Sequence, residues 1–157
     1  TSREIRTLSY LLHPPLLEES GLVSAVTWFV KGFSQRSNIE ATLTVSDDFD
    51  RLEQDIEMTL FRIVQEGLTN ISRHSQSLTA RISLQHNPAE VVLRIEDDGR
   101  GIPPEKLNGL HGNLGALGVG IAGIWERVKQ VKGELEILSN SNGTTILVVL
   151  PITEIES

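Results

Sequence analysis

The sequence predicts an α+β fold, a two-layer α/β sandwich in which helices cover one face of a mixed β-sheet. Several segments place apolar residues at helical spacing, and others alternate apolar with polar residues as strands do. Their order is helix, helix, strand, helix, strand, strand, loop, helix, strand, strand, which suits one sheet with helices on one side. The 157 residues fit a single domain that can carry its own core.

The composition excludes several classes of protein. Lys and Arg number 14 against 21 Asp and Glu, so the net charge is −7, and cysteine is absent. Disulfide-stapled modules and Cys-ligated zinc or iron–sulfur sites need cysteine, and a protein that neutralises nucleic-acid phosphates is normally basic. No apolar run approaches the ~18 residues of a membrane span. We therefore expect a soluble cytoplasmic domain that contacts neither nucleic acid nor membrane, even if its parent protein is membrane-anchored.

The first part of the chain predicts two helices and a strand. Arg3–Leu12 has helical spacing and is stopped by the prolines that follow His13, because proline disfavours the α region in the residue before it. Gly21–Arg36 carries an apolar stripe typical of a second helix. Ile39–Val45 alternates as a strand.

The longest periodic segment is Glu53–Ser75, which predicts one long helix. Its expected buried stripe consists of Ile56, Leu60, Ile63, Val64, Gly67 and Ile71. Glycine inside a helix costs about 0.8–1.0 kcal/mol relative to alanine. Gly67 therefore indicates that something packs closely against this helix.

The second half of the chain predicts a sheet interrupted by a long loop and a helix. Asp98–Leu117 is rich in Gly, Pro and Asn, and long loops of this kind are often functional lids. The expected elements around it are strands at Leu78–Gln85 and Val91–Glu96, a helix at Gly118–Lys132 stopped by Gly133, and a closing hairpin of Glu134–Leu138 and Thr144–Leu150 across Ser139–Gly143.

Polar residues recur along the long helix at positions four apart: Arg62, Glu66, Asn70 and His74. Residues at this spacing lie on roughly one helix face. One interpretation is a solvated face with pairing between Arg62 and Glu66. The other is a metal site, because amide and carboxylate oxygens are ligands that Mg²⁺ prefers when substrate phosphates and water complete its shell. Asparagine is a poor helix former, which favours a reason of this kind for Asn70.

Two glycine-rich stretches add to this pattern. Asp97-Asp98-Gly99-Arg100-Gly101 follows an apolar strand, where a carboxylate could bind a purine amine and glycines let a flat ligand approach, although an Asp-Gly turn that only ends a strand is the commoner origin of such a pair. Gly118–Gly123 has the letters of the dinucleotide fingerprint but lacks the preceding strand and the later acid. A glycine-rich helix start still offers N–H groups to an anion, so phosphate binding in this acidic chain would depend on such donors and on a metal.

The order of these motifs resembles the ATP-binding domain shared by sensor histidine kinases, DNA gyrase B/MutL-type ATPases and HSP90-like chaperones, which has the Bergerat-type fold. The likeness covers roughly Glu53–Pro151, where LFRIVQEGLTNISRHS is similar to the N box, and DDGRGIP, GVGIAGIWERV and GTTILVVLP to successive glycine boxes. The sequences of these motifs are most similar to those of the histidine kinases that pair with LuxR/NarL-type response regulators. Their Gln-Glu-x-Leu-x-Asn-x-x-x-His and Gly-x-x-Glu-Arg patterns stand here at Gln65–His74 and Gly123–Arg127.

The resemblance implies ATP and Mg²⁺ as cofactors and gives roles to residues at the phosphate end. Asn70 would bind Mg²⁺ that bridges the ATP phosphates, and Glu66 would act beside this metal in a base-like or supporting role. Arg73 and His74 would face the phosphates. The helix start would hold phosphates through the backbone amides of Gly118, Val119, Gly120 and Ile121.

At the adenine end, the resemblance implies that Asp97 binds the adenine amine while Gly99 and Gly101 make room for the ring. Thr144 or Thr145 would support adenine through hydroxyl or water contacts. The segment 102–117, which begins at Ile102, would be the ATP lid.

The resemblance also implies partners outside this chain. Such kinases phosphorylate a histidine in a His-Asp/Glu context on a dimerisation helix, and none of the four histidines here has that context. We therefore expect residues 1–17 to be the end of a dimerisation helix and its junction, and residues 18–157 to be the catalytic domain. The parent would be a homodimer and this piece a monomer.

Alternatives remain at this point. The same fold occurs in anti-sigma-factor-type serine kinases, and a degenerate site could serve as a non-catalytic nucleotide-binding scaffold. The Gln65-Glu66 to His74 wording argues against the first. The intact Asp97, Asn70 and glycines argue against the second. A DNA gyrase B/MutL-like ATPase would need the domain that follows in those proteins.

Overall fold

A computed structural model describes residues 15–47, 49–100 and 119–152 of the chain. Its elements, in order, are α2 (Pro15–Ser20), α3 (Leu22–Ser37), β1 (Glu40–Val45), α4 (Gln54–Asn70), the π-helical turn η1 (Ile71–Ser75), β2 (Thr79–His86), β3 (Glu90–Asp97), α6 (Val119–Gln130), β4 (Glu134–Asn140) and β5 (Gly143–Pro151). The helix expected at residues 3–12 lies outside the described residues.

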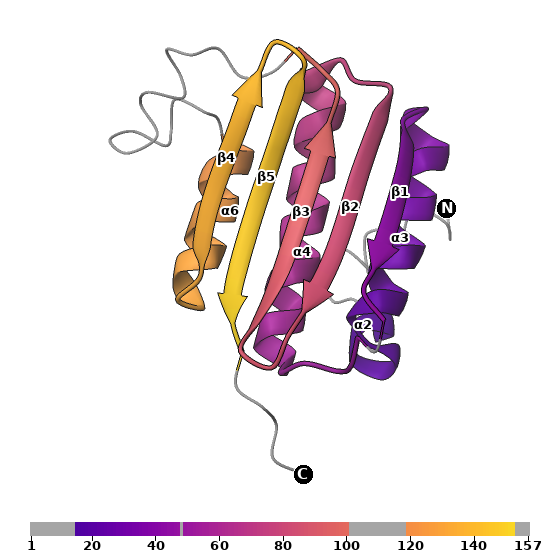
Figure 1. Cartoon of the computed structure of the whole chain (residues 1–157). Coiled ribbons are helices and arrows are strands. Elements are labelled where there is room, and N and C mark those ends of the chain that lie inside the picture. The colour runs from indigo at the N-terminus through magenta and orange to yellow at the C-terminus, as the bar shows by residue number, and fades with distance from the viewer. Residues whose placement is uncertain (1–14, 48, 101–118, 153–157) are drawn as a thin grey trace.

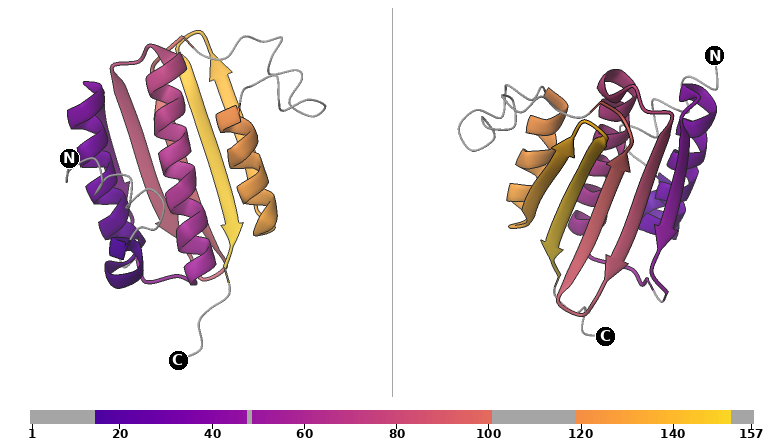
Figure 2. Two further views of the ribbon diagram at one scale, coloured as in Figure 1. Left: turned by 180° about the vertical axis from the view of Figure 1, so that it is seen from behind. Right: turned by 45° about the horizontal axis from the view of Figure 1, so that its top comes forward.

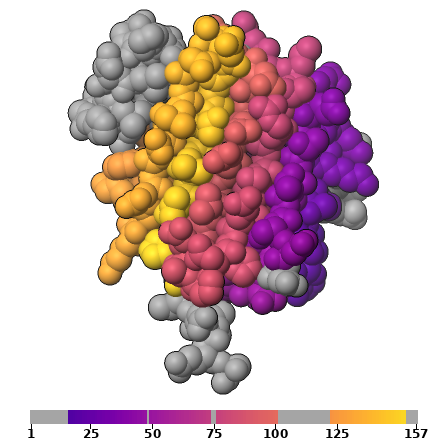
Figure 3. Space-filling model, viewed as in Figure 1, coloured from indigo at the N-terminus to yellow at the C-terminus, as the bar shows by residue number. Residues whose placement is uncertain are grey.

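The strands form one five-stranded sheet in the order β1-β2-β3-β5-β4. β1 and β2 are parallel, and all other neighbours are antiparallel, so the sheet is mixed. Helices α3, α4 and α6 lie side by side on one face of the sheet (Figures 1 and 2). In the part of the chain that the structure describes, no helix covers the other face, which is turned toward the viewer in Figures 1 and 3. The predicted two-layer sandwich is confirmed.

The core lies between the sheet and the helices because successive strand side chains point to opposite faces. In β3, Val91, Leu93, Ile95 and Asp97 are buried, whereas the residues between them are more exposed. Ile95 contacts α4, where a Cβ added to Gly67 would lie 2.7 Å from its Cδ1 atom. The buried row of β3 therefore faces the helices, and Gly67 is present because α4 passes close to β3.

The long helix is only partly as predicted. Every member of its expected stripe is buried, including Leu60 and Ile71. However, the α-helix ends at Asn70 and continues as the π-helical turn η1, which ends at Gln76 with a φ of 60°. A π-turn closes its hydrogen bonds over five residues rather than four. The chain is thus helical through Ser75 as predicted, but its last turn is π-helical rather than α-helical.

Two chain reversals also differ from their expected form. After α6 the positive φ of 60° is at Lys132 rather than at Gly133. Gly133 is instead a packing residue, since a Cβ there would lie 2.9 Å from the carbonyl oxygen of Val149. The closing hairpin is tighter than predicted, because Asn140 pairs with Gly143 and only two residues form the turn.

The short helix α2 was not predicted, although its first residue Pro15 suits a first helical turn. Arg51 fixes its far end by donating from Nη2 to the carbonyl oxygens of Leu17 at 3.5 Å and Glu18 at 3.2 Å. The same guanidinium pairs with the buried Glu57 of α4 at 3.2 Å. Residues on both sides of the junction expected at residue 17 are therefore held against the sandwich.

No helix in the part of the chain that the structure describes is long and apolar enough to cross a membrane.

Candidate functional site

The polar residues predicted for the site gather at one end of the sandwich. β3 ends and β5 begins there, beside the last turn of α4, at the top of the view in Figure 1. In the sheet register Asp97 is opposite Thr144, and Glu96 is opposite Thr145. The end of one central strand and the start of its neighbour therefore bring the two predicted adenine-binding segments together.

Asp97 is the buried acid of this end, with 7% of its surface exposed. Its Oδ1 atom accepts the backbone N–H of Gly99 at 2.8 Å. Burial raises the pKa of Asp97 above its ordinary value, and hydrogen bonds from the backbone of Gly99 and Thr144 oppose this shift. The result is a desolvated carboxylate on the helix-facing side of β3, with backbone donors that fix its orientation.

The neighbouring Asp98 has the opposite environment. Its carboxylate is exposed and accepts hydrogen bonds from Arg81 Nη1 at 2.7 Å and Thr79 Oγ1 at 2.6 Å. The pKa of Asp98 is lowered to about 2 by the hydrogen bond from Arg81 and then by that from Thr79. Ser77 also accepts the Asp98 backbone N–H at 3.0 Å. These contacts hold Asp98 outside, so that Asp97 is the acid directed toward the helices.

Glycine and threonine complete this end. Gly143 has a φ of 146°, and a Cβ on it would collide with the carbonyl oxygen of Asp97. Thr144 follows it on the helix-facing side, and its hydroxyl lies 2.8 Å from Ser139 Oγ. Thr145 points to the open face, because neighbouring strand residues alternate. Of the two candidate threonines, the fold brings Thr144 to the face of Asp97.

Helix α4 carries the two side chains whose oxygens could bind a metal ion, Asn70 and Glu66. Asn70 is its last residue and is partly buried. One turn earlier, Glu66 accepts a hydrogen bond from Arg127 Nε to its Oε1 atom at 2.9 Å, which joins α4 to α6. Arg62 donates to Gln65 Oε1 at 3.0 Å.

Other predicted site residues lie in η1, α6 and the segment between β3 and α6. Arg73 is exposed in η1, where the backbone of His74 also lies. Gly99 is buried directly after β3. Val119, Gly120 and Ile121 form the first turn of α6, as expected for backbone donors at a helix start. The residues predicted at Gly101, Ile102 and Gly118, and the lid predicted at 102–117, lie outside the described residues.

The sequence did not identify three residues that contact the site residues, namely Arg127, Arg81 and Ser77. Arg127 is part of the Gly-x-x-Glu-Arg pattern, but the pattern alone does not indicate what its side chain contacts. Its partner Glu66 is 61 positions away, and a contact at that separation has no periodic signal in one sequence. Arg81 lies on β2 and Asp98 directly follows β3, so their pairing depends on the register between these two strands.

The side chains that could hold a metal ion are few in the part of the chain described here. Those residues contain no group of three or more His, Cys, Asp or Glu that could hold a metal ion. The Oε2 atom of Glu66 is buried and, among the described residues, has no hydrogen-bond partner. Hard oxygen donors from Asn70 and Glu66 fit Mg²⁺, which takes most of its shell from water and substrate phosphates.

The described elements form a two-layer α/β sandwich with a polar cluster at one end of its sheet. The family model described as Histidine kinase-, DNA gyrase B-, and HSP90-like ATPase matches residues 55–154, and the chain belongs to this family.

Its curated relatives are sensor kinases. The signal transduction histidine-protein kinase/phosphatase DegS of Brevibacillus brevis is 30% identical, over 96% of this chain and 37% of its own length. The sensor histidine kinase NarS of Mycobacterium tuberculosis is 33% identical, over 96% of this chain and 34% of its own length. The chain therefore spans about a third of the length of these relatives.

Solved structures support the fold. The histidine kinase domain of the Erythrobacter litoralis blue-light activated histidine kinase superimposes with a TM-score of 0.71 at 20% identity, covering 96% of this chain and 74% of that one. The catalytic domain of histidine kinase ThkA gives a TM-score of 0.64 at 16% identity, covering 84% of this chain and 90% of that one.

Proposed function

We propose that this chain is the ATP-binding catalytic domain of a sensor histidine kinase in a two-component system. In this proposal residues 1–17 form the junction with a dimerisation helix, residues 18–157 form the catalytic domain, and residues 102–117 form its lid. The observation that carries the proposal is the buried, backbone-held carboxylate of Asp97 at the end of β3. The sensor kinases among the relatives favour a histidine kinase over the serine kinase and scaffold alternatives.

At the adenine end, Asp97 accepts a hydrogen bond from the exocyclic amine of the base. A desolvated carboxylate strengthens such a bond, because water does not compete for it. Gly99 and Gly101 leave room for the ring. Thr144 supports the base, since it shares the helix-facing side with Asp97.

At the phosphate end, Asn70 binds Mg²⁺ and Glu66 acts beside it. Arg73 and His74 face the phosphates, and the amides of residues 118–121 at the start of α6 donate to them. When bound, Mg²⁺ neutralises charge on the phosphate oxygens. With a net charge of −7, the chain depends on such local groups rather than on its overall field.

The reaction transfers the γ-phosphoryl group of ATP to a histidine of the dimerisation helix. The bond between the γ-phosphorus and the β,γ-bridging oxygen breaks, a nitrogen–phosphorus bond forms, and ADP leaves. The imidazole attacks in its neutral form through a ring nitrogen that carries a lone pair. Because such a nucleophile needs little activation, the chain contributes mainly by positioning and charge stabilisation. Glu66 then matters less than a true general base would.

The partners of this domain follow from the same proposal. They are the parent's own dimerisation and phosphoacceptor region and a response regulator of the LuxR/NarL type. The parent is a homodimer with its catalytic domain in the cytoplasm, and the isolated chain is a monomer that contacts no nucleic acid.

The experiment supplies the chain with γ-labelled ATP, Mg²⁺ and the separately expressed dimerisation region of its parent. We expect label on that region that is lost in acid and kept in base, as for a phosphohistidine. Asp97→Asn should slow labelling at sub-saturating ATP by about 10- to 100-fold, the range for losing a hydrogen bond to a charged group.

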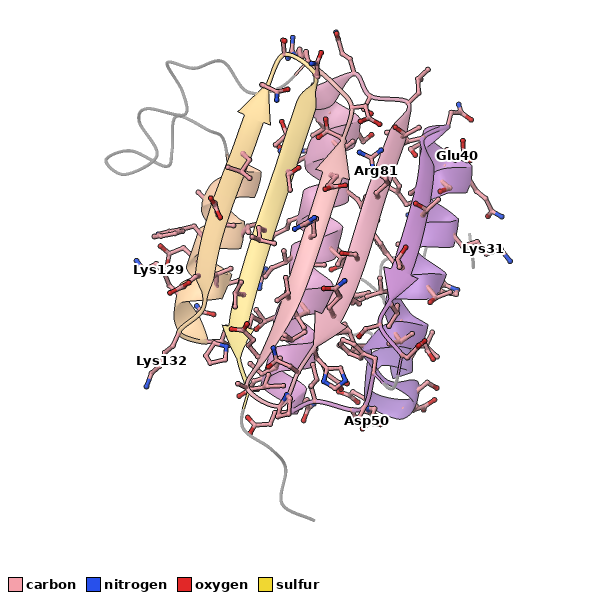
Figure 4. All side chains as sticks on the ribbon, viewed as in Figure 1. Lys31, Glu40, Asp50, Arg81, Lys129 and Lys132 are labelled. Carbon is pink, nitrogen blue, oxygen red and sulfur yellow. The ribbon has the colours of Figure 1, made fainter. Side chains whose placement is uncertain are left out.

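Asp50→Asn is the matched control. Asp50 is an exposed aspartate at the opposite end of the molecule from the site (Figure 4), so its variant should label at the wild-type rate. Acid-stable label would indicate the serine kinase instead. Nucleotide binding without any transfer would indicate the scaffold.

A further inference from the structure

Both oxygens of the Glu66 carboxylate lie against the neighbouring helix α6. Oε1 accepts the Nε–H of Arg127 at 2.9 Å. Oε2 is buried, has no hydrogen-bond partner among the described residues, and lies 3.0 Å from the position that a Cβ of Gly123 would occupy. One oxygen is thus fixed by a charged donor, and the other lies against a backbone that lacks a side chain.

Gly123 and Arg127 act from the same face of α6. They are four residues apart, which is one helical turn. The missing side chain of Gly123 lets α6 approach Glu66, and Arg127 closes over the same carboxylate one turn later. The Gly-x-x-Glu-Arg pattern therefore has a physical reason in the contact between α4 and α6.

A second arginine competes for the same carboxylate. Arg62 lies one turn before Glu66 on α4, and its pKa is lowered by burial and by the charge of Arg127, while the charge of Glu66 opposes this shift. Arg62 donates a hydrogen bond from Nη1 to Gln65 Oε1 at 3.0 Å on the same helix. The Glu66 carboxylate instead pairs with Arg127 of α6 at 2.9 Å. The position of the carboxylate therefore depends on α6.

We propose that Gly123 and Arg127 are positioning residues that hold the Glu66 carboxylate for its role beside the metal and phosphates. The inference rests on the proposed function, since it assigns what orients one of that site's residues. The bond to Arg127 uses Oε1 and leaves Oε2 as the oxygen with unused capacity to accept a hydrogen bond, one turn before Asn70. A buried acceptor without a partner calls for such an explanation.

A double-mutant cycle on the whole chain tests this assignment. ADP affinity is measured by titration calorimetry, with Mg²⁺ and with EDTA, for wild type, Glu66→Gln, Arg127→Met and the double variant. With Mg²⁺ each single variant should bind about tenfold more weakly, the scale for groups that support metal ligands. The double variant should lose no more than the singles, because both remove one interaction. In EDTA all four should agree within about twofold.

Two further variants separate positioning from simple stabilisation. Gly123→Ala should weaken Mg²⁺-dependent binding although alanine favours the helix, so its Tm should not fall. Arg127→Lys should regain part of the lost affinity. Lys129→Met is the control, because Lys129 is an exposed cation on the same helix (Figure 4) and should leave binding unchanged.

Additive losses in the cycle, or equal losses with Mg²⁺ and with EDTA, would overturn the positioning role. A Gly123→Ala variant that binds ADP with Mg²⁺ as tightly as wild type would overturn the positioning role as well, even if Arg127→Met fails to fold. If wild type itself shows no Mg²⁺-dependent nucleotide binding, the proposed function fails and this inference fails with it.

Discussion

At the residue scale, the two adjacent aspartates at the end of β3 lie in different environments. Asp97 is buried and its pKa is raised by burial. Asp98 is exposed and its pKa is lowered to about 2, chiefly by the hydrogen bond from Arg81. Arg81 lies on the open face near the start of β2 (Figure 4). The register between β2 and β3 therefore decides which acid is free to bind a ligand from the helix side.

These opposite shifts predict how nucleotide binding depends on pH. The ionised Asp97 is a stronger acceptor for the adenine amine than the protonated acid, because its hydrogen bond is charge-assisted. ADP affinity should therefore be constant at neutral pH and fall as the pH drops through the raised pKa of Asp97. That fall should come at a higher pH than an aspartate with the ordinary pKa of 3.8 would give. Asp98 stays ionised throughout, because its pKa is about 2.

The measurement is a series of ADP titrations in steps of decreasing pH, with circular dichroism to confirm that the protein remains folded. Asp97→Asn should bind weakly and show no such step. A wild-type affinity that follows only the titration of the nucleotide's own phosphate would contradict the assignment of Asp97.

The linkage to stability has the opposite sign for the two acids. Burial penalises the ionised form of Asp97, so its ionisation destabilises the fold as the pH rises through the raised pKa. Asp98 gains its partners in the folded state, so its contribution is present above the unfolded pKa and is lost as the pH falls through about 2.

At the scale of elements, the packing of α4 on β3 depends on Gly67. Gly67→Ala gains about 1 kcal/mol of helix propensity. Its new Cβ would meet Ile95 Cδ1 at 2.7 Å, and overpacking of this kind costs about 1–3 kcal/mol. The packing cost exceeds the propensity gain, so we expect the free energy of unfolding to fall by about 1 kcal/mol in urea denaturation.

Gly32 of α3 is the matched helical glycine. A Cβ there would meet only the end of the flexible Arg36 side chain, at 2.8 Å from Nη1. Gly32→Ala should therefore stabilise the chain by up to about 1 kcal/mol. If both substitutions changed the free energy of unfolding equally, the close approach of α4 to β3 would not restrict the side chain at residue 67.

The elements also show what one sequence can predict. The strands around Ile95 and the stripe on α4 were predictable, because alternation and helical spacing are local signals of burial. The change to a π-turn after Asn70 depends on how the chain leaves α4 for β2, which has no periodic signal. The partner of Glu66 was not predictable either, since an intrahelical pair with Arg62 fits the same spacing as the pair with Arg127 that the fold contains.

For the candidate site, the sequence predicted residue types but not directions. Thr144 and Thr145 are equivalent in the motif, and only the register opposite Asp97 separates them. Gly133 was expected to end α6, but the structure shows that a glycine is needed there because the chain passes close to β5. Both differences arise from contacts between strands or layers that are distant in sequence.

At the scale of the whole molecule, the arrangement gives the sandwich a polarity. The ends of α4 and β3 and the start of β5 lie together at one end, while the turn between β2 and β3 lies at the other (Figure 2). Asn70 and Asp97 belong to the first end because they are the last residues of α4 and β3. Asp50 lies at the second end (Figure 4). Substitutions at the two ends can therefore separate loss of binding from loss of folding.

The central claim is that this end binds an adenine nucleotide through Asp97 and Asn70. Calorimetric titration of the chain with ADP and Mg²⁺ tests it most directly, using wild type, Asp97→Asn, Asn70→Asp and Asp50→Asn. We expect one site with micromolar-to-millimolar affinity. Its affinity should be weakened about tenfold or more by Asp97→Asn, clearly weakened by Asn70→Asp, and unchanged by Asp50→Asn. A wild-type chain that binds no ADP, or an Asp97→Asn variant that binds as well as wild type, would contradict it.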